Sequence, residues 1–171
     1  LRIGVYEHSS AARDFLTETV AKLGAEAVPL ARSDTFIPVD TEAVDPDTRA
    51  MLRGWCAEHG LDAVISTDGD ADRPMVTDAS GNIVPGDVLG ALTAQFLDAQ
   101  VLCTPVSSNT AVDAMGFSRI ERTRIGSPFV IAAMETVLDA DPAAAVVGYE
   151  ANGGFLLGFT AQGPAGSIAP L

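Results

Sequence analysis

Short apolar runs alternate with longer amphipathic segments along the first half of this chain, and this alternation limits the folds open to it. The predicted strands cover residues 1–7, 25–30, 61–67 and 73–78. The predicted helices cover residues 10–24 and 45–60, with Ser10 and Asp45 as N-terminal caps and Gly24 and Gly60 at the C-terminal stops. Strands that alternate with helices favour α/β architecture with largely parallel pairing.

The second half repeats this alternation after a break near residues 98–101. A helix predicted over 85–97 precedes this break and ends the first half. After the break the predicted elements are helices over 109–116 and 126–138, and strands over 101–106, 119–124, 143–150 and 154–159. The last two strands are joined by the tight connection A-N-G-G. We therefore expect two consecutive α/β domains, residues 1–99 and 100–171, each with a mixed, largely parallel sheet flanked by helices.

The charge balance excludes several classes of function. The chain has 23 acidic against 10 basic residues, a formal net charge of −13, which argues against a role on nucleic acid or anionic lipid. No apolar run approaches the roughly 20 residues of a membrane span. Cys56 and Cys103 match no metal or redox spacing, so we expect two buried free thiols in a reducing cytoplasm.

Three aspartates at alternate positions follow the apolar run 61–67, in the stretch S-T-D-G-D-A-D-R. On an extended loop alternate residues point to the same side, so Asp68, Asp70 and Asp72 would converge. Three converging carboxylates repel unless a cation neutralises them, and Mg²⁺ takes oxygen ligands. Arg73 would then hold a phosphate beside the metal.

Other interpretations of this stretch remain. One alternative is a solvent-exposed acidic turn, because D-G-D repeats also occur as plain turns. A calcium-binding EF-hand loop is excluded. It needs glycine at its sixth position and glutamate at its twelfth, and these positions counted from Asp68 hold Arg73 and Ala79. A phosphatase of the haloacid dehalogenase type has an apolar strand followed by D-x-D, with Asp68 as nucleophile. Asp72 stands where that class has a small β-branched residue, but the alternative remains open.

Two further groups of polar residues lie in the second half. Glu150, Asn152 and Gly153 would grip vicinal sugar hydroxyls, or they would form a plain hairpin turn. Arg122 and Arg124 share one face of a predicted strand that Arg119 begins, and would meet a phosphate or balance nearby acid.

The two histidines, and the serines at positions 9 and 10, carry no predicted chemistry. We interpret His8 and His59 as surface or loop histidines. Ser9 and Ser10 are interpreted as capping residues rather than nucleophiles.

Three motifs in this order resemble the α-D-phosphohexomutases, the phosphomannomutase and phosphoglucomutase family. D-G-D-A-D-R (68–73) is similar to the family's metal loop D-G-D-G-D-R. R-T-R-I-G (122–126) is similar to its segment of T-x-x-G type. G-Y-E-A-N-G-G (148–154) resembles its sugar-recognition loop, usually G-E-x-S-G-H.

The resemblance implies a role for each matching position. Asp68, Asp70 and Asp72 would bind Mg²⁺, and Arg73 would approach the phosphate of a phosphoserine supplied by another domain. Glu150, Asn152 and Gly153 would hold the hexose, and Arg124 would lie near the transferred phosphate where many relatives have a lysine. The implied reaction moves phosphate between C1 and C6 of a mannose or glucose phosphate.

The resemblance covers only the second and third of the family's four domains, so residues 1–99 would be domain II and 100–171 domain III. The serine motif T-A-S-H-N-P and the fourth, phosphate-gripping domain are absent from this sequence. We therefore expect a fragment of a longer cytoplasmic enzyme that is inactive alone and works with the parent's N- and C-terminal domains. The sugar-recognition loop departs from the family's usual sequence at two positions, where Asn152 replaces serine and Gly154 replaces histidine. A non-catalytic module that binds metal or sugar phosphate is the remaining alternative.

Overall fold

A computed structural model describes residues 1–163 and 166–170 and divides the chain into two compact units. The first unit is Leu1–Val84 and the second is Pro85–Leu171. Within the described residues no helix is both long and apolar enough to cross a membrane. Both units contain strands and helices, which confirms the predicted α/β class.

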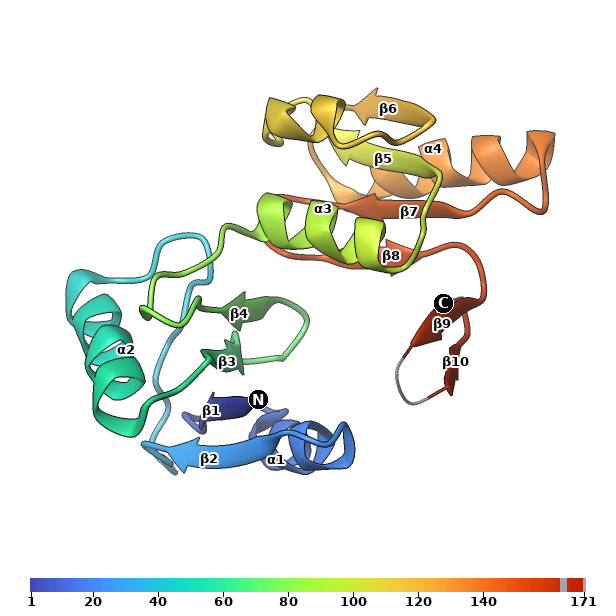
Figure 1. Ribbon diagram of the computed structural model, residues 1–171. Helices are drawn as coiled ribbons and strands as arrows, with labels where there is room; N and C mark the ends of the chain where they lie inside the picture. The colour runs from blue at the N-terminus through green and yellow to red at the C-terminus, as the bar shows by residue number, and fades with distance from the viewer. Residues whose placement is uncertain (164–165, 171) are drawn as a thin grey trace. The chain divides into compact units, whose positions relative to one another are not determined.

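The first unit is a four-stranded sheet in the order β2-β1-β3-β4 (Figure 1). Its strands are β1 (Arg2–Tyr6), β2 (Glu26–Leu30), β3 (Ala63–Thr67) and β4 (Pro74–Val76). β1 pairs in parallel with β2 and with β3, and β4 returns antiparallel to β3. The helices α1 (Arg13–Lys22) and α2 (Pro46–His59) make the two parallel crossovers. Right-handed crossovers in opposite directions place them on opposite faces of the sheet.

Local signals set both bounds of α2 but only the C-terminal bound of α1, which Gly24 ends with φ +86°. Asp45 caps α2 by accepting a hydrogen bond from the Thr48 amide at 2.9 Å, and Gly60 ends it with φ +60°. The cap expected at Ser10 is wrong, because α1 begins at Arg13 with Ala12 in the cap position. The Ser10 hydroxyl instead hydrogen-bonds Thr67 at 2.5 Å.

The second unit repeats the strand order of the first, as β6-β5-β7-β8. Its strands are β5 (Val101–Pro105), β6 (Arg119–Thr123), β7 (Val146–Tyr149) and β8 (Phe155–Leu157), with the first three parallel and β8 antiparallel. Its helices are α3 (Gly86–Phe96), the 3₁₀ turn η1 (Thr110–Ala114) and α4 (Ser127–Ala140). A separate antiparallel pair, β9 (Ala161–Gly163) and β10 (Gly166–Ile168), follows and has no counterpart among the predicted elements.

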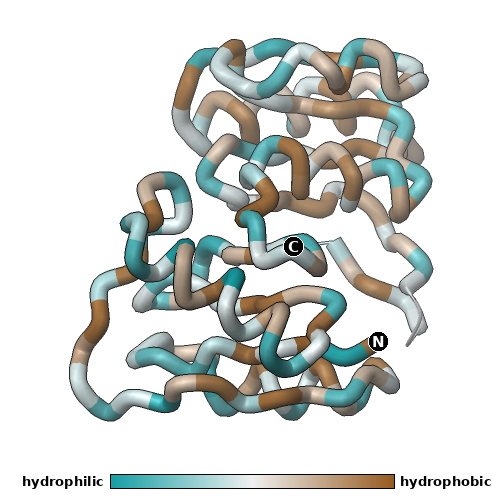
Figure 2. Tube along the Cα trace, turned by 60° about the vertical axis from the view of Figure 1, so that its left-hand side comes forward, coloured by the Kyte–Doolittle hydropathy of each residue, from teal (hydrophilic) through white to brown (hydrophobic). Residues whose placement is uncertain are grey.

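Both faces of the second sheet are buried. Leu102, Val147 and Tyr149 belong to a cluster shared with α3 and η1, whereas Cys103 and Val146 belong to a cluster shared with α4. Alternate strand residues therefore point to opposite faces, each covered by helix. Figure 2 shows brown, hydrophobic stretches recurring along the chain between teal, hydrophilic ones.

Helix α3 belongs to the compact unit that follows it. A Cβ at Gly90 would lie 2.5 Å from Cγ of Tyr149, so α3 packs closely on β7. The units consequently divide at Val84, whereas the domain division expected from the sequence falls after residue 99. Helix packing, which the sequence pattern does not report, accounts for this difference.

Candidate active site

The loops after β1 and β3 lie side by side at the carboxyl edge of the first sheet. The first crossover runs from β1 to β2 and the second runs from β2 back past β1 to β3, so the winding reverses between β1 and β3; ligands of open α/β sheets bind at such a switch point. The amide of Ala11 donates to the carbonyl of Gly69 at 3.0 Å, which joins the two loops. The aspartate loop 68–73 is held at this edge.

The three aspartates predicted as metal ligands come together. One carboxylate oxygen from each of Asp68, Asp70 and Asp72 lies within 4.8 Å of the other two. Asp68 is only 9% exposed, whereas Asp70 and Asp72 are exposed to solvent. Oxygens around one Mg²⁺ lie about 3 to about 4 Å apart. A small inward movement of the two exposed side chains would therefore fit the three oxygens to this ion.

Arg73 partly balances the charge of the aspartate loop. Its Nε lies 3.7 Å from a carboxylate oxygen of Asp72 and 4.0 Å from one of Asp68. Loss of hydration raises the pKa of the Asp72 carboxyl, and a hydrogen bond and the charges of Asp68 and Asp70 raise it further, against the opposing charge of Arg73. The loop therefore holds more negative charge than it can stabilise by itself, as expected of a cation site.

The backbone of the aspartate loop is tight at both ends. The Asp68 amide donates to the Arg73 carbonyl at 3.1 Å, and the Arg73 amide donates to the Asp68 carboxylate at 3.3 Å. Between them Ala71 has φ +69°, a left-handed conformation that favours glycine. This geometry turns the alternate side chains to one side, at some cost in backbone strain.

The second unit carries a comparable loop at the same topological position. Residues 150–154 connect β7 to the antiparallel β8, just as residues 68–73 connect β3 to β4. The Glu150 amide donates to the Gly154 carbonyl at 3.0 Å, and the Gly154 amide donates to Oδ1 of Asn152 at 2.9 Å. Glu150 is half-buried at the end of β7, so its carboxylate stands at the carboxyl edge of this sheet.

The three arginines around β6 have different surroundings. Arg122 donates to Asp113 at 2.8 Å and to the Ser108 carbonyl at 3.2 Å, so its guanidinium balances nearby acid. Arg119 forms an ion pair with Glu121. Arg124, just beyond the end of β6, is exposed and lies over the ring of Phe129, 5.6 Å from its centroid.

Comparison with known proteins places the chain in a family. Residues 1–81 match the family model described as phosphoglucomutase/phosphomannomutase, alpha/beta/alpha domain II. Phosphomannomutases from Sinorhizobium fredii and Salmonella muenchen are 48% and 50% identical over 158 residues, which is 92% of this chain. The chain belongs to the phosphoglucomutase/phosphomannomutase family. It spans about a third (33%) of the length of these two relatives.

A solved structure supports the fold. A phosphoglucomutase/phosphomannomutase family protein from Burkholderia thailandensis superposes with a TM-score of 0.73 at 19% identity. The match covers 92% of this chain and 35% of that chain. The family model and the two phosphomannomutases confirm the family resemblance drawn from the three motifs, while the roles of individual residues stay predictions.

The interpretation of His8 as a surface or loop histidine is right about the loop and wrong about the surface. His8 follows β1 and is fully buried, with its ring 4.9 Å from that of Tyr6 and tilted to it. Its Nε2 donates to the carbonyl of Thr67 at 2.8 Å. Only its place after the strand at the switch point would have indicated this, because Thr67 is 59 residues away.

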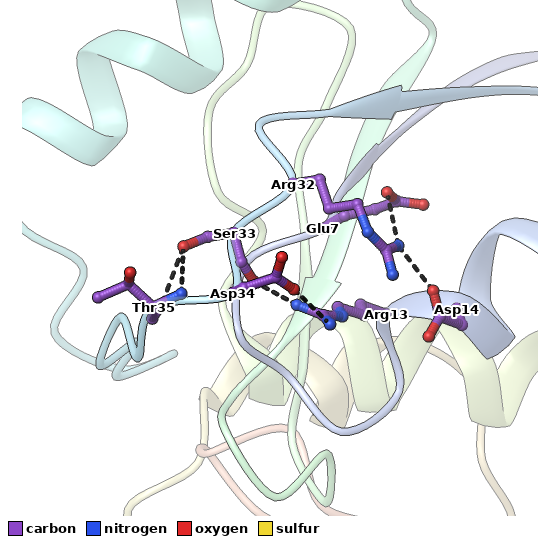
Figure 3. A network of polar contacts seen from close by, with 7 residues as sticks. All are labelled: Glu7, Arg13, Asp14, Arg32, Ser33, Asp34 and Thr35. Atoms are coloured by element: carbon purple, nitrogen blue, oxygen red, sulfur yellow. Dashed lines mark hydrogen bonds and ion pairs between the residues drawn. The ribbon is translucent and has the colours of Figure 1, made fainter.

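A polar network at the carboxyl ends of β1 and β2 was also not predicted from the sequence. The Glu7 carboxylate, 5% exposed, accepts from Thr17 at 2.7 Å and from Arg32 at 3.3 Å. Figure 3 shows the contact of Glu7 with Arg32. Arg32 also pairs with Asp14 at 2.6 Å, and its hydrogen bond is the main cause that lowers the pKa of Asp14. The network ties the ends of β1 and β2 to α1, which fixes the carboxyl edge of the sheet.

Proposed function

We propose that this chain supplies the metal-binding loop and the sugar-recognition loop of a phosphomannomutase. The parent enzyme would move phosphate between C1 and C6 of a hexose by way of a phosphoserine. The observation that carries this proposal is the convergence of three carboxylates within 4.8 Å, inside the region that matches domain II of the family. The phosphoserine would come from another domain of the parent chain.

In this proposal the first unit handles the transferred phosphate. Asp68, Asp70 and Asp72 hold Mg²⁺, which when bound supplies positive charge to neutralise a phosphoryl group in transfer. Arg73 lies beside two of these carboxylates, so its guanidinium is placed to donate hydrogen bonds to a phosphate entering the site. Its planar group fixes the orientation of that phosphate as a lysine would not.

The second unit handles the sugar in this proposal. Glu150 and Asn152, with the backbone of Gly153, accept and donate hydrogen bonds to ring hydroxyls. Arg124 lies near the transferred phosphate. A bisphosphate intermediate must bind in two opposite orientations. Groups that hydrogen-bond the ring hydroxyls tolerate this reversal better than a phosphate-specific pocket does. The names of the two relatives favour a mannose phosphate over a glucose phosphate.

A replacement experiment tests the proposal. Residues 1–171 would replace the corresponding segment of the Salmonella muenchen phosphomannomutase, and conversion of mannose 1-phosphate would be measured. We expect an active chimera whose kcat falls about a hundredfold or more with Asp70→Asn. The matched control is Asp47→Asn, an exposed aspartate on α2, which should leave kcat unchanged. A folded but inactive chimera, or equal activity of both variants, would contradict the proposal.

The isolated chain distinguishes the phosphatase alternative. The phosphomannomutase proposal predicts no hydrolysis of p-nitrophenyl phosphate with Mg²⁺ by the 171-residue chain. A phosphatase with Asp68 as nucleophile would hydrolyse it, and Asp68→Asn would abolish the hydrolysis. The largely buried position of Asp68 suits a metal ligand, because an attacking carboxylate must reach its substrate.

A further inference from the structure

The segment 8–11 holds the backbone on both sides of Asp68. Nε2 of His8 donates to the carbonyl of Thr67, and the hydroxyls of Ser10 and Thr67 lie 2.5 Å apart. The amide of Ala11 donates to the carbonyl of Gly69. These three contacts, which we call the loop clamp, fix the residue before Asp68 and the residue after it.

His8 and Ser10 both reach Thr67 through their side chains, and His8 is the more deeply buried of the two. It has no exposed surface, and Tyr6 packs on it while Trp55 packs on Tyr6 with the ring centroids 5.2 Å apart. A closely packed ring has little freedom to turn, so the direction of its Nε2–H bond is fixed. The position of the Thr67 carbonyl is therefore fixed by the core of the first unit.

The other ring nitrogen of His8 is buried without a hydrogen bond. A carbonyl oxygen only accepts, so Nε2 is the donor and Nδ1 is left as an acceptor. Among the described residues nothing hydrogen-bonds to Nδ1. Burying an unpaired acceptor opposes folding. A histidine is thus a poor choice for core packing alone at this position, and its hydrogen bond to Thr67 is the compensating feature.

We propose that His8 is a positioning residue for the aspartate loop. Through the Thr67 carbonyl it sets where the Asp68 carboxylate stands relative to Asp70 and Asp72. The inference rests on the proposed function in so far as these aspartates bind a metal. Its effect on the loop itself is independent of any metal.

Two substitutions separate positioning from packing. In His8→Gln the side-chain amide N–H lies about as far from Cα as Nε2 of histidine, so it keeps a donor for Thr67. His8→Leu keeps apolar volume but has no donor. His59→Gln, which changes the other histidine, is the control. Fluorescence of Trp55, the single tryptophan, reports whether each variant keeps the packing around Tyr6.

The first measurement is amide hydrogen exchange of residues 68–73 without metal. We expect these amides to exchange about tenfold faster in His8→Leu than in the wild type, which is the effect of losing one hydrogen bond of ordinary strength. In His8→Gln and His59→Gln we expect them to exchange at the wild-type rate. Unchanged exchange in folded His8→Leu would overturn the inference. Equal acceleration of exchange across the whole first unit in both His8 variants would also overturn it, because that is the result of a packing role.

The second measurement is a titration with MnCl₂, followed by the loss of the free Mn²⁺ electron paramagnetic resonance signal. We expect about tenfold weaker binding in His8→Leu and near wild-type binding in His8→Gln. Equal affinity of wild type and His8→Leu would overturn the positioning of the ligands while leaving the metal site in place. Absence of Mn²⁺ binding by the wild type would instead contradict the proposed function, and the exchange measurement would still decide the role of His8.

Discussion

Gly86 lies where the start of α3 meets the proposed sugar loop, and replacing it should disturb that loop. A Cβ at this position would lie 2.3 Å from the carbonyl oxygen of Ala151 and 2.4 Å from the amide nitrogen of Gly153. Ordinary Cβ contacts begin near 3.4 Å, so the loop backbone must move by about 1 Å. Both clashing atoms belong to the backbone, and no change of rotamer can relieve them.

We expect Gly86→Ala to lower the free energy of unfolding by about 2 kcal/mol, within the range for overpacked sites. Gly54→Ala on α2 is the matched control, because a Cβ there meets nothing within 4 Å. The control should raise the free energy of unfolding by about 1 kcal/mol, the difference in helix propensity. Guanidinium unfolding followed by circular dichroism measures both.

The two variants should also differ in ligand binding. Calorimetry with mannose 1-phosphate on the active chimera should show weaker binding for Gly86→Ala and unchanged binding for Gly54→Ala. The reasoning would be refuted if Gly86→Ala were as stable as the wild type, or if both substitutions changed stability in the same direction.

Three further predictions concern strain, burial and charge. Ala71→Gly should stabilise the chain by about 0.5 kcal/mol in guanidinium unfolding, because relief of the left-handed strain exceeds the added entropy of the unfolded glycine; a loss of stability would count against the strain. Burial raises the pKa of the Cys103 thiol to about 11, so at pH 8 about one thiol in a thousand is ionised, and a thiol reagent should label it only on unfolding; rapid labelling of the native chain would contradict this. The pKa of Asp72 is raised in the folded chain, so its ionisation opposes folding as pH rises. Asp72→Asn should therefore stabilise the metal-free chain by an amount that grows as the pH rises above about 4, the ordinary pKa of an aspartate, and levels off above the raised pKa of the folded chain. A pH-independent difference in unfolding free energy would refute this.

The elements that sequence patterns predicted well are those with local signals. Helix α2 has its cap at Asp45 and its left-handed stop at Gly60, and each acts within one turn of the helix. The start of α1 was missed because the Ser10 hydroxyl is engaged by Thr67, which is distant in sequence. The division at Val84 was missed because it depends on how closely α3 approaches β7.

The same distinction applies to the candidate site. The aspartates converge as expected because they are alternate residues of one short loop. The burial of His8 and its bond to Thr67 depend on the parallel pairing of β1 with β3, which no local pattern reports. The different surroundings of Arg122 and Arg124 likewise depend on neighbours, Asp113 and Phe129, that only the fold supplies.

The most direct test of the account is the effect of Mg²⁺ on thermal unfolding of the chain. At a free Mg²⁺ concentration about 100 times the dissociation constant, binding to the folded state alone adds about 2.7 kcal/mol. We predict that Mg²⁺ raises the melting temperature of the wild type and of Asp47→Asn, and that Asp70→Asn abolishes the rise. The same rise in Asp70→Asn as in the wild type would contradict the assignment of the aspartate loop as the metal site.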